Sequence, residues 1–358
     1  MVRFSCQCVV PPYVLEKLAG SSNPAVRRAA VEALQIAAAV RAGRLVRAGA
    51  PRMNARRARA EGLERNIYDM RSRPVYYLPG TLVRSEGQPA SADAAVNEAY
   101  DYSGNVYNFY KELFGRNSLD NRGMALDSSI HTGDRFNNAF WNGEQMAYGD
   151  GDGVIFQGFT KSLDVVAHEL THGVVTHTAN LEYQNESGAM NEHFADVFGV
   201  LVKQHTLGHD VQAADWLIGR EVMVPRPTVR ALRSFDEKVA YSNDEYLGDD
   251  PQPKHMRDKY TGTEDYGGVH INSGIPNHAF YRFAKALGGN AWEKPGQIWY
   301  RALLSLQPLS EFSDLVRETL DAAAVIHGEG SPEIGALADA WDAVGLQQCV
   351  ASARARRR

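Results

Sequence analysis

The sequence has few cysteines, no long apolar run and no strong excess of charge. Its 358 residues include only three cysteines, Cys6, Cys8 and Cys349, which excludes a disulfide framework as the main source of stability. No run of about 18 apolar residues occurs, so we expect no transmembrane helix. A net charge of −5 gives no reason to expect a nucleic acid as a partner. Charged residues and two prolines interrupt residues 1–19, so no secretory signal sequence is recognisable.

The charge that is present is unevenly distributed. Residues 1–60 carry 11 Lys and Arg against 2 Asp and Glu, and the last nine residues add four arginines. The net charge is therefore +9 in the N-terminal stretch and −18 in residues 61–349. This contrast favours a basic leader that docks on an acidic body, although a solvated leader or an organellar transit peptide would have the same composition.

The composition changes along the chain in a way that predicts an α+β fold. After the leader, short apolar runs alternate with turn residues, which indicates a β-rich lobe containing one helix over residues 91–114 that begins at Ser91. From Leu163 onward the apolar residues follow a helical period. We therefore divide the chain into a basic leader (1–58), a β-rich N-terminal lobe (59–160), a mostly helical lobe (161–349) and a basic tail (350–358).

The strongest motif is His168-Glu169-Leu170-Thr171-His172, with apolar residues on both sides. In a helix, residues i and i+4 share one face, so both imidazoles can reach one metal ion. Imidazole suits zinc, and a catalytic zinc needs three protein ligands and an open position for water. Glu169 would lie beside that water as a general base. The motif also arises by chance, but its apolar flanks predict a buried helix, where unpartnered ionisable groups are costly.

Glu192 is the candidate for the third ligand. It begins the next helical period, 20 residues beyond His172, and Asp196 lies on the same helical face. Asp196 is then placed to accept a ring N–H from a ligating histidine, for which we favour His168, and to fix its tautomer. The alternative from the residues alone is that Glu192 is a capping or surface carboxylate.

The region around this motif resembles the thermolysin family of neutral zinc endopeptidases. The resemblance covers about residues 67–346 and is carried by several motifs in order. It implies a two-lobe α+β fold with the zinc helix between a β-rich N-terminal lobe and a mostly helical C-terminal lobe. The matching segments are 137–143 (NNAFWNG), 148–153 (YGDGDG), 183–192 (YQNESGAMNE), 215–216 (DW), 232–234 (LRS), 267–274 (GGVHINSG) and 340–345 (AWDAVG).

The resemblance implies a role for each matching side chain. Zinc, held by His168, His172 and Glu192, would activate water for attack on the peptide carbonyl, with Glu169 as the base. His270 and Tyr183 match the donors to the oxyanion, and Asp265 matches the carboxylate that orients His270. The residues that match substrate contacts are Asn138, Ala139, Trp141, Arg233, Val165, Ile218, Val222 and Leu232. The last four of these match the wall of the pocket that receives the residue after the cleaved bond. All four are apolar, so we predict cleavage before bulky hydrophobic residues.

The leader resembles the short pro-segment of protealysin-like members of that family. This likeness rests on residues 11–15 (PPYVL), and it implies that Pro11, Pro12, Tyr13 and Leu15 lie in the active-site cleft. The predicted protein is then a zymogen whose partners are peptide substrates and its own leader, which is cleaved within residues 50–63. Cys6 or Cys8 could instead ligate zinc as a thiolate.

The sequence departs from the family at its paired calcium site. Asp164 and Asp215 match two of the calcium carboxylates, but Lys203, Leu217 and Arg220 stand where three others would be. Because calcium needs six to eight oxygen ligands, we predict that this double site is absent and that Lys203 and Arg220 pair with the two aspartates. A separate calcium ion elsewhere stays open.

Three questions remain open at the level of sequence. A silent binding module could keep the fold and the metal, although the retained base and oxyanion donors disfavour it. The leader could be a lasting inhibitor rather than a removable one. The family resemblance predicts secretion, while the missing signal sequence leaves a cytoplasmic location as the alternative.

Overall fold

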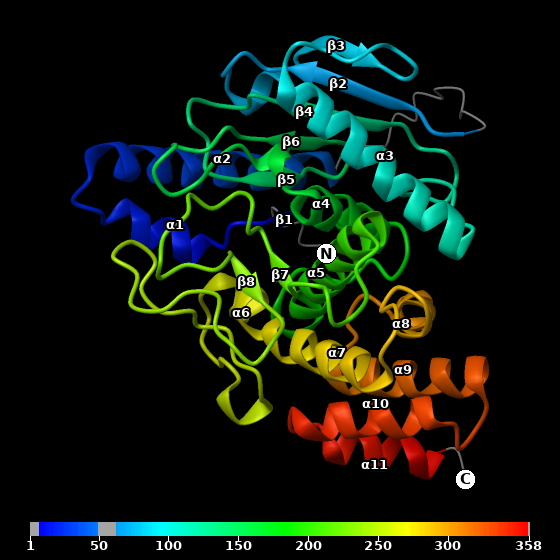
Figure 1. Cartoon of the computed structure of the whole chain (residues 1–358). Helices are drawn as coiled ribbons and strands as arrows, with labels where there is room; N and C mark the ends of the chain where they lie inside the picture. Colours follow the sequence, from blue (N-terminus) through cyan, green and yellow to red (C-terminus); the bar gives the residue numbers. More distant parts are fainter. Residues whose placement is uncertain (1–6, 49–61, 357–358) are drawn as a thin grey trace.

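Two buried helices separate a small mixed sheet from a helical lobe (Figure 1). The computed structural model describes residues 7–48 and 62–356. Helices α4 (Leu163–Thr176) and α5 (Asn185–Leu207) run through the centre and are buried over almost their whole length. A helix that is covered on every side needs small or apolar residues around its whole circumference, as the Val, Ala, Gly and Phe positions of both helices provide.

The sheet forms the upper layer in Figure 1. Its strand order is β1-β5-β6-β4-β2-β3, with parallel pairing of β2 with β4 and of β4 with β6, and antiparallel pairing elsewhere. The strands are short because turn residues interrupt each apolar run. Their bounds are β1 Gln7–Cys8, β2 Arg65–Asp69, β3 Thr81–Ser85, β4 Leu126–Ile130, β5 Ala139–Trp141 and β6 Met146–Tyr148.

Helix α3 (Ala94–Phe114) covers one side of the sheet and also packs on α4. The sequence predicts Ser91 as its cap, and this prediction is wrong by two residues. Asp93 is the N-cap and accepts a hydrogen bond from the Ala95 amide, while the Ser91 hydroxyl accepts from the Asp93 amide. Both residue types cap helices well, so composition alone does not choose between them.

The C-terminal lobe is built from helices that follow a small two-stranded sheet. Strands β7 and β8 pair antiparallel, and β7 lies beside α5. None of the helices in the described part of the chain is long and apolar enough to cross a bilayer. The bounds are β7 Leu217–Ile218, β8 Arg233–Ser234, α6 Asp265–Asn272, α7 Gly274–Leu287, α8 Lys294–Ser305, α9 Phe312–His327, α10 Pro332–Ala343 and α11 Gln347–Arg356, with 3-10 turns at Val75–Tyr77, Phe159–Lys161 and Met256–Asp258.

The leader adds strand β1 to the sheet edge and two helices beside it, α1 (Pro12–Ala19) and α2 (Pro24–Ala48). The Asn23 side chain accepts from the Ala25 amide at the start of α2. The proposed domain boundary at residues 58 and 59 lies outside the described residues.

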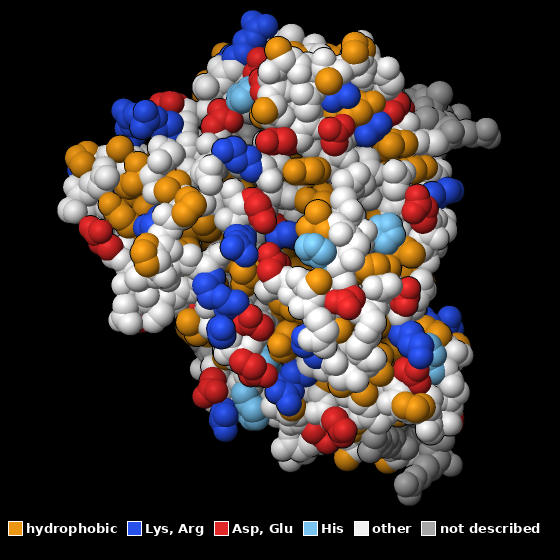
Figure 2. All heavy atoms as spheres, viewed as in Figure 1, with side chains coloured by type: hydrophobic (Ala, Val, Ile, Leu, Met, Phe, Trp, Pro, Cys, Tyr) orange, Lys and Arg blue, Asp and Glu red, His pale blue; other side chains and the backbone are white. Residues whose placement is uncertain are grey.

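Apolar packing holds the described part of the leader to the body. Buried residues recur from Val9 to Val40, including Val14, Leu15 and Leu18. Among described leader side chains, the one salt bridge to the body joins Arg28 and Asp134 at 3.9 Å, with both side chains well exposed. On the face in Figure 2, acidic and basic side chains are interspersed rather than divided between leader and body.

Candidate active site

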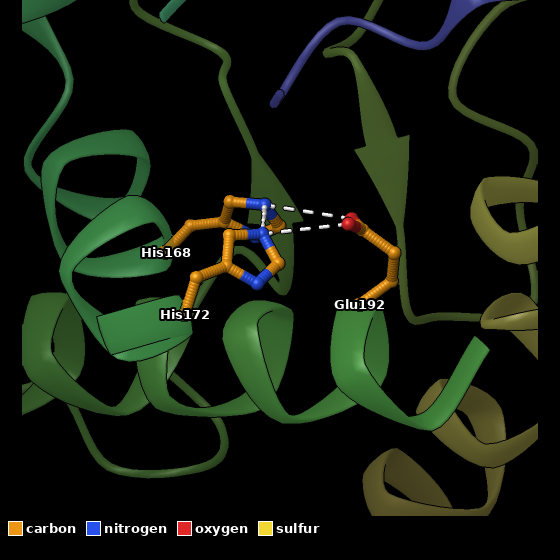
Figure 3. Close-up of side chains that lie close together, drawn as sticks. All are labelled: His168, His172 and Glu192. Atoms are coloured by element: carbon orange, nitrogen blue, oxygen red, sulfur yellow. Dashed lines mark hydrogen bonds and ion pairs between the residues drawn. The ribbon is translucent and has the colours of Figure 1, made fainter. Parts of the chain in front are cut away.

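Helices α4 and α5 bring three metal-ligating side chains together (Figure 3). His168 and His172 lie on one face of α4, and Glu192 points toward them from α5. The two Nε2 atoms are 3.1 Å apart, and the Glu192 carboxylate oxygens lie 3.5 Å from His168 Nε2 and 3.4 Å from His172 Nε2. All three side chains are buried.

The outer hydrogen bonds of the histidines fix both tautomers. His168 Nδ1 lies 2.9 Å from Asp196 Oδ1, and a carboxylate can only accept, so this nitrogen carries the proton. His172 Nδ1 lies 2.9 Å from Asn191 Oδ1, whose amide nitrogen donates to the Leu181 carbonyl, so Nδ1 is again the donor. Both Nε2 lone pairs therefore face each other.

This donor set fits a zinc ion. Two facing lone pairs and a buried carboxylate oxygen without a hydrogen-bond partner, Glu192 Oε2, need a cation between them. A tetrahedral zinc with Zn–N bonds of about 2.0–2.1 Å separates two nitrogens by about 3.3 Å, close to the observed spacing. The predicted ligand trio is thus a set of groups that the fold brings together. Asn191, the partner of His172, is a residue that the sequence analysis missed.

Glu169 lies on α4 beside the trio, with its carboxylate at the sheet edge. Its Oε2 accepts a hydrogen bond from the Trp141 amide at 3.0 Å, while Oε1 has no hydrogen-bond partner. The Val9 amide of the leader lies close to this carboxylate. Burial, and next the charge of Glu192, raise the pKa of Glu169 well above its ordinary value. The carboxylate thus favours binding a proton, which suits a general base.

His270 and Asp265 are held together by an unusual left-handed turn at the start of α6. Four successive residues, 265–268, have positive φ, and two of them are glycines that tolerate this conformation. The turn lets Asp265 accept from the His270 amide at 2.8 Å and from its Nδ1 at 2.6 Å. Burial lowers the pKa of His270, but Asp265 and then Glu192 outweigh it and raise this pKa to about 9. Tyr183 donates to Glu192 and lies 3.0 Å from His270 Nε2.

The predicted apolar pocket residues gather around Gly219. A side chain at Gly219 would meet Leu232 and Val222 at 3.2 Å and Val165 at 3.6 Å, and the neighbouring Ile218 is fully buried. Arg233 lies at the edge of this group, where it donates to both carboxylate oxygens of Asp196. Burial alone raises the pKa of Asp196, but Arg233 and His168 hold it below its ordinary value.

Comparison with known proteins decides the family. The model described as "Thermolysin metallopeptidase, catalytic domain" matches residues 52–176, and that described as "Thermolysin metallopeptidase, alpha-helical domain" matches residues 179–346. The chain belongs to the thermolysin family. It is therefore a zinc metalloendopeptidase, and the predicted two-lobe fold is confirmed.

Individual relatives agree with this assignment. An "Extracellular metalloprotease" of Pectobacterium carotovorum subsp. carotovorum is 43% identical over 95% of this chain and 96% of its own length. A "Thermolysin" of Alicyclobacillus acidocaldarius is 44% identical over 78% of this chain and 50% of its own length. The solved precursor of protealysin from Serratia proteamaculans has a TM-score of 0.84 at 42% identity, covering 95% of this chain and 99% of that structure.

In this thermolysin-family chain, the leader crosses the site as an extended strand. Gln7 and Cys8 pair antiparallel with β5, and the Val9 amide donates to the Ala139 carbonyl at 3.3 Å. His270 Nε2 lies 3.0 Å from the Cys8 carbonyl oxygen. The Cys8–Val9 peptide bond is thus flanked by His270 on its carbonyl side and by Glu169 on its amide side.

The next leader residues are held by the predicted substrate contacts. Arg233 Nη1 donates to the Val9 carbonyl at 2.7 Å. Asn138 donates to the Val10 carbonyl at 3.0 Å and accepts from the Val10 amide at 2.9 Å, as a β-strand partner would. Both contacts use only the main chain of the leader, so they constrain its conformation rather than its sequence.

The Pro-Pro-Tyr-Val-Leu segment begins α1 directly after this strand. Pro11 is the N-cap and Pro12 the first helical residue, a position that needs no backbone N–H. Leu15 is buried, and the Tyr13 hydroxyl lies near Tyr241. Burial, and next the charge of neighbouring Tyr241, raise the pKa of Tyr13 well above its ordinary value.

The alternative of a thiolate ligand does not apply to Cys8 in this structure. Cys8 is disulfide-bonded, and it faces the site with its carbonyl oxygen. The other candidate, Cys6, lies outside the described residues.

At the family's calcium position, a lysine stands among the carboxylates. Lys203 Nζ lies 2.9 Å from Asp164, 3.0 Å from Glu221 and 3.3 Å from Asp215. Its pKa is raised because these three carboxylates outweigh the opposing effect of burial. The predicted pairing of Arg220 is wrong within the described residues, where Glu221, its neighbour in the chain, completes the cluster instead and Arg220 makes no ion pair within 4 Å.

Proposed function

We propose that this chain is the zymogen of an endopeptidase that cleaves peptide bonds before bulky hydrophobic residues, with Glu169 as general base. The observation that carries the proposal is the path of the leader. Its main chain pairs with β5 and contacts Arg233 and Asn138, as an extended peptide substrate would. The leader is then an intramolecular inhibitor that occupies the place of the substrate.

The chain's own residues would divide the chemical work at the peptide bond. When zinc is bound by His168, His172 and Glu192, it polarises the peptide carbonyl and activates water. Glu169 would take the proton of the attacking water and pass it to the leaving nitrogen of the substrate. In this structure the Val9 amide lies near Glu169, at the place proposed for that nitrogen.

Two further side chains would stabilise the charge that develops on the carbonyl oxygen. His270 Nε2 and the Tyr183 hydroxyl are the donors, and His270 already contacts the Cys8 carbonyl. Asp265 holds the His270 ring in place. Asn138, Arg233 and the Ala139 carbonyl would keep the substrate extended, so that its reacting bond does not need to be aligned after binding.

Specificity would come from the apolar group around Gly219. A charged side chain placed among Val165, Val222 and Leu232 would lose its hydration without gaining a partner. We therefore expect Leu, Phe or Ile after the cleaved bond. A peptide library scored by the residue after the cut tests this, and a preference for charged residues there would contradict it.

We propose an extracellular site of action, because the Pectobacterium relative carries that description over nearly its whole length. Detection of the mature enzyme in culture medium rather than in the cell lysate tests this part. Retention of the active enzyme inside cells would overturn it.

The catalytic proposal is tested by Glu169→Ala. This variant should bind zinc with unchanged stoichiometry but should lose casein hydrolysis by at least a hundredfold, which is the lower range of a general base's contribution. N-terminal sequencing of both proteins, with and without a chelator, shows whether the leader leaves by the chain's own activity. A Glu169→Ala variant that still hydrolyses casein would support a different base and refute this mechanism.

A further inference from the structure

A chain of buried hydrogen bonds leads from the C-terminal lobe to the zinc ligand His168. Trp299 Nε1 donates to His193 Nε2 at 2.8 Å. His193 Nδ1 lies 2.7 Å from Asn277 Oδ1, and Asn277 Nδ2 donates to Asp196 Oδ2 at 2.9 Å. Asp196 is the carboxylate that holds His168.

The direction of this chain is fixed by its first member. An indole nitrogen can only donate, so His193 Nε2 must be the accepting nitrogen and Nδ1 must carry the ring proton. The Nδ1 proton then requires the carbonyl end of Asn277, which leaves the amide nitrogen to face Asp196. Each of these three side chains therefore donates a hydrogen bond toward the zinc site, and the last of them, Asn277, donates to the Asp196 carboxylate.

This chain of hydrogen bonds joins four helices. Trp299 lies on α8, Asn277 on α7, His193 and Asp196 on α5 and His168 on α4, and α7 and α8 lie below α4 and α5 in Figure 1. His193, Asn277 and Trp299 are fully or almost fully buried. A buried imidazole and a buried amide each cost free energy unless they are bonded, and here both are bonded on two sides.

We propose that Asn277, oriented by His193 and Trp299, is a positioning residue that sets the orientation of Asp196 and thereby of the zinc-binding nitrogen of His168. The proposal rests on the zinc site of the proposed function. Arg233 binds the same carboxylate through both oxygens. Asn277 differs from Arg233 because it does not contact the leader strand in the described residues, so its hold on Asp196 is independent of whether a peptide occupies the cleft.

The position of His193 next to Glu192 makes the network reach two ligands at once. Its ring is anchored by α7 and α8, and this fixes the turn of α5 that carries Glu192. A loosened ring at this position would therefore disturb the carboxylate ligand as well as the Asp196–His168 pair.

The test compares the zinc affinity of variants of the full chain by competition with a chromophoric chelator. Asn277→Leu removes the donor to Asp196, and Trp299→Phe removes the group that sets the direction of the chain. Losing a direct hydrogen-bond partner of a metal ligand usually lowers metal affinity by about 10–100-fold, and Asn277 acts one bond further out, through Asp196. We therefore expect zinc affinity to fall by about tenfold, the lower end of that range, in Asn277→Leu and by less in Trp299→Phe.

Trp341→Phe is the matched control. Trp341 stacks on Trp299 with ring centroids 5.9 Å apart, is equally buried, and donates its own indole N–H to Thr319, outside the network. It should lose stability without losing zinc affinity. Equal zinc affinities in Asn277→Leu and the parent chain, or equal losses in both tryptophan variants, would overturn the proposal.

Two further measurements keep the result interpretable. If Trp299→Phe does not fold, His193→Asn and His193→Gln replace it, since Asn retains a donor near the Nδ1 position and should keep more of the zinc affinity than Gln. In the cobalt-substituted protein, Asn277→Leu should shift the visible absorption of the metal. His168→Ala separates the two claims: if it binds zinc as tightly as the parent chain, the proposed zinc site itself fails.

Discussion

The ammonium group of Lys203 balances the charge of a carboxylate cluster that would otherwise call for a metal ion. This group is mostly buried and lies within 3.3 Å of three carboxylates, one of which, Asp164, is fully buried. Taking away one partner of a buried ion pair leaves an uncompensated charge. The residue therefore has a larger effect on stability than an ordinary surface lysine.

We expect Lys203→Ala to lower the free energy of unfolding by about 3–5 kcal/mol, the range for breaking a buried ion pair. Urea titration measures this, with Arg220→Ala as control, because Arg220 makes no ion pair within 4 Å in the described part of the chain. Added calcium should leave the melting temperature of the unsubstituted protein unchanged. A rise of several degrees with calcium would show that the double site is present after all.

His131 predicts a pH dependence in a different part of the molecule. Its two ring nitrogens lie 2.8 Å from Asp150 and from Asp93, the N-cap of α3. Asp150 first, and then Asp93, raise the pKa of His131 to about 9 against the opposing effect of burial. A group whose pKa is higher in the folded state stabilises the fold fully below its unfolded pKa, about 6.5, and this contribution is lost as the pH rises through about 9.

His131→Gln should therefore lower the melting temperature most at about pH 6 and hardly at all at about pH 10. Thermal unfolding of both proteins across this range measures the difference. His209→Gln is a suitable control, since His209 forms no ion pair within 4 Å in residues 7–48 and 62–356. A deficit of constant size at every pH would mean that His131 acts by packing rather than by charge.

At the scale of elements, the left-handed turn at the start of α6 decides where His270 lies. Each non-glycine residue in this conformation costs roughly 1–2 kcal/mol. Because two of the four residues are glycines, only Asp265 and Tyr266 contribute this cost. There is also no space for a side chain, because a Cβ at Gly268 would lie 2.6 Å from the Tyr260 ring and one at Gly267 2.2 Å from the Asn185 side chain.

We expect Gly268→Ala to lower kcat at least tenfold, because the turn must open and move Asp265 away from His270. Steady-state kinetics on a short peptide measures this. Gly289→Ala has a similar φ of +65° and nothing within 4 Å of its added Cβ, so it carries the backbone cost without the clash and should keep kcat. Equal kcat values for the two variants would contradict this view of the turn.

The elements also show what a sequence can and cannot specify. The spacing of His168 and His172 predicts their convergence because one helix fixes it, and Glu192 follows from the next helical period. The network of Trp299, His193 and Asn277 joins residues that are 84 and 106 positions apart, and no local pattern encodes such contacts.

Smaller errors have equally local causes. Ser91 and Asp93 are both good caps, and only the first hydrogen bonds of α3 distinguish them. Arg220 and Glu221 are neighbours in a loop, and a shift by one residue there exchanges which of them faces Lys203. The family resemblance named the substrate contacts, but it did not give the strand β1, which is too short to carry a pattern.

At the scale of the whole molecule, the leader and the body form one core. Leu18 of α1 is fully buried, and so are Val26 and Ala30 of α2. Packing of this kind acts at short range and is insensitive to salt, unlike the attraction between opposite net charges. The stability of the inhibited state should therefore depend on a few apolar contacts rather than on ionic strength.

We expect Leu18→Asp to shorten the lag before proteolytic activity appears, since a buried carboxylate without a partner loosens α1 from the body. Activity against casein, followed from the moment of purification together with gel analysis of the leader, measures the lag. Glu16→Ala on the exposed face of the same helix should leave it unchanged. If both variants mature at the parental rate, α1 does not limit release.

Strand β1 lies at the edge of the sheet, and its departure would uncover the hydrogen-bonding groups of β5. A mature enzyme with that bare edge could accept only polypeptide that is drawn out straight over several residues, because helices and tight turns have no free main-chain groups to offer. Native proteins would then be cleaved where they unfold locally, in hinges, frayed ends and partly unfolded segments. The rate of proteolysis would therefore reflect how readily the target protein unfolds locally.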